Sequence, residues 1–158
     1  MVTIITATIL MSASPLSAQW TNDAVTVNIN ANMPEITQLK FTESGTIIPL
    51  ATETPTWTNI GTMHARSNQT DGYIIAVSST NSGVLQGPLG ETVAYSLRYG
   101  GSEYSSLTGS VTVATATDRT SFAGVASEVE ISPLVNLDAD FLYAGTYTDT
   151  LTFTISAQ

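Results

Sequence analysis

The chain has 158 residues, which is enough for one domain with a single hydrophobic core. It contains no cysteine, so disulfides and thiolate metal sites are excluded. Thirteen acidic residues against four basic ones give a formal net charge of -9, which would repel phosphate groups, so nucleic acid binding is not expected.

Residues 1–18 have the features of a signal peptide. An apolar stretch from Val2 to Met11 passes into small residues that end at Ala18. We therefore expect cleavage after Ala18, followed by a single domain over residues 19–158. The apolar stretch is shorter than the roughly 20 residues of a membrane-spanning helix, so no membrane anchor is expected. A buried N-terminal strand is the alternative.

The rest of the chain alternates between apolar and polar residues, as β-strands do. Residues 24–31 place Val25, Val27, Ile29 and Ala31 on one face and polar residues on most of the other. Further strands are predicted at residues 36–41, 46–50, 57–65, 72–79, 92–99, 110–116, 127–131 and 146–157. Turn signals separate them and helical periodicity is nearly absent. These features predict an all-β, immunoglobulin-like antiparallel β-sandwich.

The last predicted strand, residues 146–157, is the most regular. Threonine and serine line one face, and the other face carries Leu151, Phe153 and Ile155, with Asp149 as an interruption. Such a strand lies at a sheet edge, or it pairs with something other than the next segment of its own chain.

The sequence contains no catalytic constellation, so an enzyme is not expected. His64 is the only histidine, and no Gly-x-Ser-x-Gly motif marks a serine nucleophile. Glu128 and Glu130 share one face of a predicted strand, where a solvated face explains them better than a pair of catalytic carboxylates. No cofactor and no metal are expected.

Backbone pairing is the chemistry that remains. The segment 19–32 contains the apolar face of Val25, Val27, Ile29 and Ala31, which could be added as a strand to the open sheet edge of another subunit. The same segment could also be the first strand of its own sandwich.

Several short motifs resemble a known family. Arg66-Ser67-Asn68, Gly72-Tyr73, the run from Ser96 to Gly101 and the run from Ala144 to Tyr147 lie between the alternating segment and the last strand. This layout resembles the cysteine-free major pilins of the alpha-type chaperone-usher fimbriae, and more loosely the spore-coat-protein-U-type pilins. In such pilins an incomplete immunoglobulin-like subunit is completed by a donor strand of the next subunit.

The resemblance implies roles for particular residues and partners. The donor face would be Val25, Val27, Ile29 and Ala31, and the accepting edge would be Leu151, Phe153 and Ile155. The partners would be identical or related pilin subunits, a periplasmic chaperone and an outer-membrane usher. The chain would be secreted through the periplasm to a fimbria on the cell surface. The alternative is a self-complete β-sandwich adhesin module that binds a host or surface glycan.

Overall fold

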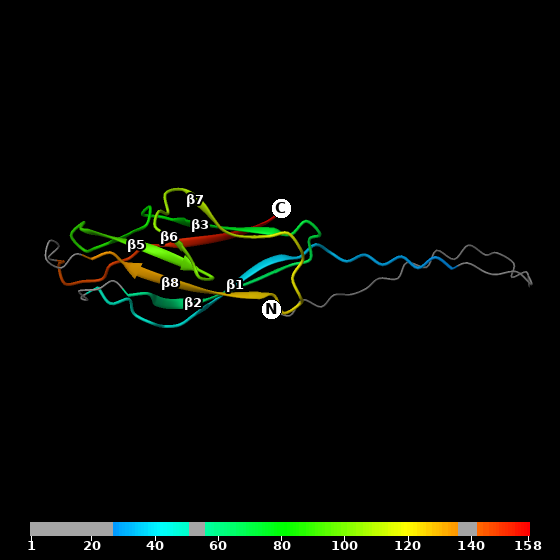
Figure 1. Ribbon diagram of the computed structural model, residues 1–158, viewed down its shortest axis with the longest axis horizontal. Coiled ribbons are helices and arrows are strands. Elements are labelled where there is room, and N and C mark those ends of the chain that lie inside the picture. Colours follow the sequence, from blue (N-terminus) through cyan, green and yellow to red (C-terminus); the bar gives the residue numbers. More distant parts are fainter. Residues whose placement is uncertain (1–26, 51–55, 136–141) are drawn as a thin grey trace, which may run out of the picture. The chain divides into compact units, whose positions relative to one another are not determined.

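The computed structural model describes residues 27–50, 56–135 and 142–158, and over these ranges it contains strands and no helix (Figure 1). The chain divides into two units, Met1–Met33 and Pro34–Gln158, and every strand belongs to the second unit. The strands are β1 (Thr37–Glu43), β2 (Thr58–Ser67), β3 (Tyr73–Ser79), β4 (Val84–Gln86), β5 (Thr92–Tyr99), β6 (Ser102–Tyr104), β7 (Ser110–Ala116), β8 (Val125–Pro133) and β9 (Leu151–Ala157).

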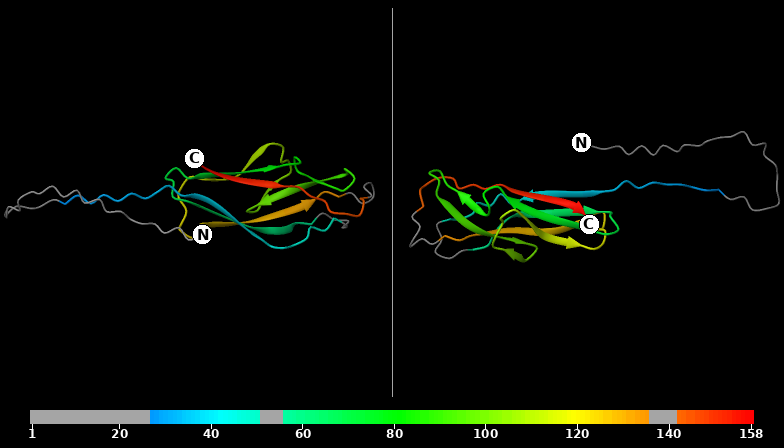
Figure 2. Two further views of the ribbon diagram at one scale, coloured as in Figure 1. Left: turned by 180° about the vertical axis from the view of Figure 1, so that it is seen from behind. Right: turned by 90° about the horizontal axis from the view of Figure 1, so that it is seen from above.

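The strands form two sheets that face each other (Figures 1 and 2). One sheet has the order β1-β2-β8-β5-β4, with β6 paired to β5, and the other has the order β7-β3-β9. Every strand pair is antiparallel. The predicted antiparallel β-sandwich of immunoglobulin-like type is therefore confirmed.

The core lies between the sheets and is set by the two-residue period of the strands. Leu97 of β5 and Val129 of β8 point inward from the larger sheet, and Ile75 and Val77 of β3 point inward from the smaller one, all of them essentially inaccessible to solvent. The residues that alternate with them on β3 and on the first part of β8 are more exposed, whereas Ser96 of β5 and Ser132 of β8 are buried. Alternation in the sequence therefore sets which face of each strand is buried.

Most of the predicted strands are confirmed, with small shifts at their ends. β5 and β7 have the predicted bounds, and two short strands that the sequence did not predict, β4 and β6, both pair with β5. The strand predicted at residues 46–50 is wrong, because this stretch belongs to no strand. Pro49 lies within it and has no N–H for a ladder hydrogen bond. Ile48 and Leu50 nevertheless pack against the core.

The strand predicted at residues 24–31 is not formed over its described part. Residues 27–31 belong to no strand, and the side chains of Val27 and Ile29 are 75% and 88% exposed. Val25 lies outside the described residues. Over residues 27–31 the apolar side chains therefore do not cover a core face.

The last predicted strand begins later than expected, at Leu151 instead of Thr146, because the chain changes sheets just before it. Thr148 exchanges two backbone hydrogen bonds with Gln86, next to the larger sheet, and from Leu151 onward the chain pairs with β3 of the smaller sheet. Asp149 lies at this transition. The irregularity that the sequence shows at Asp149 therefore marks a crossing between sheets.

Candidate strand-binding groove

Two sheet edges lie near each other on one side of the sandwich. Within the described residues, β9 pairs with β3 alone and β1 pairs with β2 alone, so each strand has one edge without a ladder. Cα atoms of β1 and β9 come within 8 Å of each other, yet no ladder joins the two strands. Unpaired edges of this kind present rows of N–H and C=O groups to a further strand.

An apolar groove of about 310 Å³ lies along these edges. Its lining comes from three strands and consists of Leu39 and Phe41 of β1, Ile60 and Met63 of β2, and Leu151 and Phe153 of β9. None of these side chains carries a charge or a hydrogen-bonding group other than the weakly accepting thioether of Met63. The groove therefore favours apolar side chains of an added strand.

The predicted accepting residues on β9 differ in their exposure to the groove. Leu151 and Phe153 line the groove, whereas Ile155, further along the same face of β9, packs against the core and is not part of the lining. The ring of Phe153 also lies 6.2 Å from that of Tyr99, centroid to centroid. Of the three residues predicted for the accepting edge, Leu151 and Phe153 are thus the two that line the groove.

The opposite wall of the groove was not predicted from the sequence. Leu39 and Phe41 alternate within the predicted strand 36–41, and this alternation was the signal that could have identified them. Their place beside β9 depends on which strands lie at the sheet edges, and sequence periodicity does not specify this. Phe41 is 39% exposed, which is high for an aromatic side chain in a strand.

A glycine makes room for Phe41. The β2–β8 register shifts between Asn59 and Gly61, so a β-bulge lies at this point. A Cβ atom on Gly61 would lie 2.5 Å from Phe41 Cζ and 2.4 Å from the carbonyl oxygen of Thr42. The ring of Phe41 therefore packs directly against the backbone at Gly61, and any side chain at this position would displace the ring from the groove wall.

The start of β9 is anchored by a carboxylate. Ser79 Oγ and Tyr95 Oη donate to Asp149 Oδ2 at 2.5 and 2.6 Å, and the backbone N–H groups of Asn81 and Thr150 donate to Oδ1 at 3.0 and 2.7 Å. Partial burial raises the pKa of Asp149, but these hydrogen bonds together outweigh burial and leave the pKa lowered. Both sheets thus hold the strand in place at one end.

The other residues that the sequence singled out lie elsewhere. His64 is half-buried on β2, Glu128 is exposed on β8, and Glu130 pairs with Arg98 at 3.3 Å. No group of three potential metal ligands occurs among the described residues. Over the same ranges, no helix has the length and apolar character to cross a membrane.

Comparisons with known proteins include a distant likeness to a solved structure. No protein-family model matches this chain, and a search of the curated proteins finds no significant relative. A solved structure of the CooA pilin subunit from enterotoxigenic Escherichia coli is similar over 75% of this chain and 87% of that chain, with 18% sequence identity and a TM-score of 0.43. At these values the likeness carries no functional weight, so function has to be inferred from the geometry of the groove.

Proposed function

We propose that this chain is a structural subunit of a bacterial surface fimbria, not an enzyme, and that it polymerises by strand addition. Its groove between β1 and β9 accepts residues 24–31 of a neighbouring subunit, with Val25, Val27, Ile29 and Ala31 as the donor face. Residues 1–18 are a signal peptide that directs export to the periplasm. A periplasmic chaperone and an outer-membrane usher are the partners that such assembly requires.

The observation that carries this proposal is the combination of an apolar groove with two unpaired edges and an apolar alternating segment whose described part, residues 27–31, belongs to no strand. Apolar residues at every second position recur about every 7 Å along an extended strand, which is the spacing of Leu151 and Phe153 on β9 and of Leu39 and Phe41 on β1. A donor segment in this position would gain ladder hydrogen bonds and apolar contacts together.

The apolar part of this interaction is substantial. Burying one Val or Ile side chain contributes about 1.5–3 kcal/mol. Val27 and Ile29 are 75% and 88% exposed, so most of this contribution would be gained only when they are buried. The entropy lost when the segment is ordered and when two subunits join opposes this favourable free energy. The net affinity therefore depends on how well each side chain fits the groove.

Insertion also requires movement of β1. A strand placed between two others needs about 9.5 Å between its neighbours, twice the usual strand spacing. Some Cα atoms of β1 and β9 are within 8 Å of each other. The donor would therefore displace β1, which only the β2 ladder holds, while the start of β9 stays fixed by Asp149.

A pair of adjacent substitutions tests the proposal in the chain that starts at Gln19. Val27→Asp should block assembly, because the groove would have to bury an unpaired charge at a cost of several kcal/mol. Asn28→Asp adds the same charge on the other face of the segment and should leave assembly intact. Size-exclusion chromatography with light scattering and electron microscopy would measure the polymers, and thermal denaturation would measure the fold.

The melting temperature of the monomer distinguishes a donor segment from an internal strand. If residues 24–31 are a donor, Val27→Asp leaves the melting temperature of the monomer unchanged, and a peptide of residues 24–32 raises it. A Val27→Asp monomer that unfolds would instead identify the segment as an internal strand, and the self-complete module would replace the pilin proposal. Normal polymers from Val27→Asp would also contradict the proposal.

A further inference from the structure

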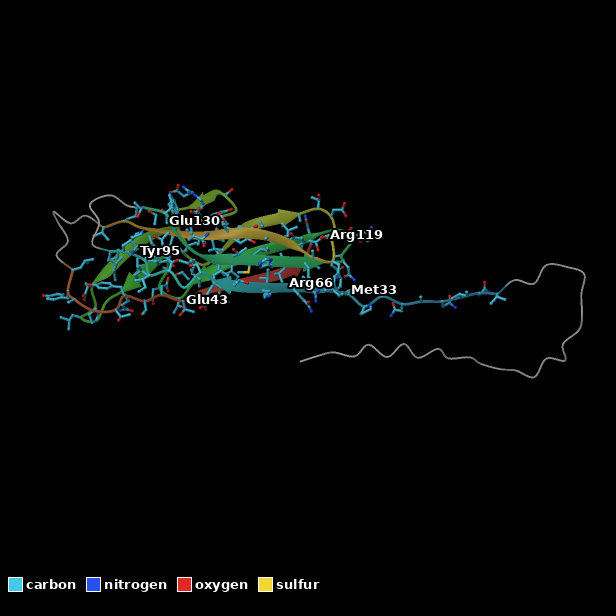
Figure 3. All side chains as sticks on the ribbon, turned by 90° about the horizontal axis from the view of Figure 1, so that it is seen from below. Met33, Glu43, Arg66, Tyr95, Arg119 and Glu130 are labelled. Carbon is cyan, nitrogen blue, oxygen red and sulfur yellow. The ribbon has the colours of Figure 1, made fainter. Side chains whose placement is uncertain are left out.

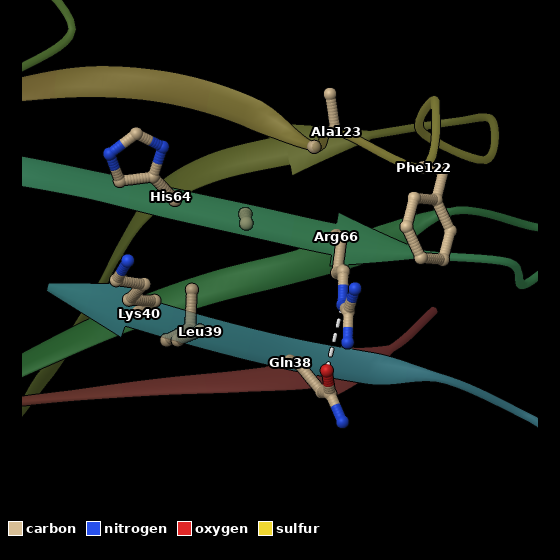
Figure 4. A pocket seen from close by; sticks show the side chains of 9 residues that line it. Gln38, Leu39, Lys40, His64, Arg66, Phe122 and Ala123 are labelled. Atoms are coloured by element: carbon tan, nitrogen blue, oxygen red, sulfur yellow. Dashed lines mark hydrogen bonds between the residues drawn. The ribbon is translucent and has the colours of Figure 1, made fainter. Parts of the chain in front are cut away.

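A second hollow, of about 360 Å³, lies on the outer face of the larger sheet, away from the core (Figure 4). On the ladder of β1 and β2, Lys40 is opposite His64 and Gln38 is opposite Arg66, so four polar side chains stand together on one face. Residues 122–124, which precede β8, complete the lining together with the strand residues Leu39 and Ala65. Phe122 contributes a side chain that is 84% exposed.

This hollow concentrates positive charge on an acidic protein. The chain has four Lys and Arg residues and a net charge of -9, and two of those four residues line the hollow together with the only histidine. Within the described residues, neither Lys40 nor Arg66 forms an ion pair. The salt bridge found in this part of the chain joins Arg98 to Glu130, and neither of these residues lines the hollow. Two neighbouring cations without a counterion repel each other, so an anion bound between them would be stabilised.

The guanidinium of Arg66 is held in position. Its Nε donates to Gln38 Oε1 at 2.7 Å, and its carbon lies 5.3 Å from the centroid of the Phe122 ring, within the range of a cation–π interaction. Thr120 fixes the adjoining loop to the end of β2, because its N–H donates to the Ser67 carbonyl oxygen at 2.9 Å and its Oγ1 accepts from the Ser67 N–H at 3.0 Å.

This arrangement leaves the two terminal nitrogens of Arg66 without a partner among the described residues. Such a fork matches the geometry of an acidic group with two oxygens. Lys40 stands diagonally across the ladder and can contact the same anion. The nearest carboxylate on this face of the neighbouring strand belongs to Glu128, which is opposite Thr62 and therefore beyond His64 from Arg66.

We propose that this hollow binds an acidic sugar unit, with its carboxylate or sulfate on Arg66 and Lys40. Its volume is at the lower end of the range of about 300–1,000 Å³ for small-molecule sites and suits one or two sugar rings. The Gln38 amide and the His64 imidazole supply hydrogen-bonding groups for hydroxyls, and Phe122 supplies an apolar wall. The site is separate from the groove between β1 and β9, so it adds a binding activity to the subunit.

The test compares three probes with the chain that starts at Gln19: lactose bearing sialic acid on its galactose, lactose bearing sulfate at the same position, and lactose itself. Titration calorimetry or ligand-observed NMR should detect at least one acidic sugar bound ten times more tightly than lactose. Arg66→Gln and Phe122→Ala should weaken that binding at least tenfold. Arg119→Gln removes the same charge from an exposed residue outside the hollow and should change affinity less than twofold.

The results also separate this site from the strand-binding groove. Arg66→Gln should leave the melting temperature and polymer formation unchanged, whether or not polymers form by strand addition. The preferred acidic probe tells a carboxylate site from a sulfate site. Equal affinity for lactose and both acidic sugars, no binding of any of them, or equally tight binding of a glutamate-rich peptide would each overturn the proposal.

Discussion

Asp149 shows how a single residue can look misplaced in a sequence and be well placed in a fold. It interrupts the apolar face of the last predicted strand, yet in the structure its two oxygens accept four hydrogen bonds at the point where the chain crosses between sheets. The partners Ser79, Asn81 and Tyr95 are distant in sequence. Periodicity detects the exception, but the partners become visible only in the folded chain.

Asp149→Asn should lower the free energy of unfolding by about 1 kcal/mol at pH 7, a modest value because the carboxylate is partly accessible to solvent. The lowered pKa of Asp149 in the folded state means that its stabilisation is fully present above its unfolded pKa. This stabilisation is lost as the pH falls through the lower folded value. The difference between wild type and Asp149→Asn should therefore shrink between about pH 5 and pH 2.

Urea denaturation at several pH values would measure this effect. Asp71→Asn is the matched control, because Asp71 is an exposed turn residue whose side chain has no hydrogen-bond partner within the described residues. A difference between Asp149→Asn and wild type that stays constant from pH 7 to pH 2 would show that the carboxylate charge is not what stabilises the start of β9.

At the scale of elements, the strands with strict alternation and clear turns were predicted well. β5 and β7 have the predicted bounds, since their inward residues form the core and glycine turns follow or precede them. β4 and β6 have three residues each, which is too short to show a period, and they exist because β5 offers them a partner. The periodicity of a strand can be recognised in its own sequence, whereas its pairing partner cannot.

On β9 the two faces should respond differently to a charge. Leu151→Lys should have a small effect on the monomer, since a lysine can extend from the open groove into water, but it should prevent assembly because an added strand would bury the charge. Thr152→Lys places the same charge on the opposite, exposed face. Thermal denaturation and size-exclusion chromatography would compare the two variants.

The expected pattern is loss of polymers for Leu151→Lys and normal polymers for Thr152→Lys, with both monomers folded. The groove would be excluded as the acceptor if Leu151→Lys assembled as well as wild type. If Thr152→Lys blocked assembly instead, the opposite face of β9 would be the contact surface between subunits.

At the scale of the whole molecule, charge opposes self-association. The net charge of -9 makes two copies repel each other, and salt screens this repulsion over about 10 Å at 0.1 M. Two of the four basic residues, Arg66 and Arg119, lie at one end of the sandwich, and Tyr95 and Glu130 lie toward the other end (Figure 3). The approach of a second copy of this acidic chain is therefore expected to depend on ionic strength.

If the chain polymerises as proposed, raising NaCl from about 20 to about 300 mM, a range over which screening becomes strong, should accelerate polymerisation several-fold. A capped peptide of residues 24–32 contains no charged residue, so its binding to the same groove should hardly depend on salt. Light scattering would follow polymers, and tryptophan fluorescence would follow the peptide. Equal salt dependence of the two reactions would mean that repulsion between subunits does not limit assembly.

The sequence thus predicted the fold class, and it singled out two of the six residues that line the groove, but it did not predict where the groove lies. Leu151 and Phe153 were identified from one strand, whereas Leu39 and Phe41 face them only because β1 lies at the edge of the other sheet. The cationic hollow was missed for a similar reason. No sequence pattern links Lys40 to His64 and Arg66, and it is the antiparallel register of β1 and β2 that brings them together.

The unpaired edge of β9 also has a consequence for solubility. Natural sheet edges often carry lysine, proline or a bulge that discourages chance pairing, whereas β9 consists of Leu, Thr, Phe, Ile, Ser and Ala alone. A short, uncharged, β-prone segment without proline is the composition from which cross-β aggregates grow. A strand that covered this edge would therefore also hinder amyloid-like stacking, and the chain with an open groove is expected to aggregate more readily as its concentration rises.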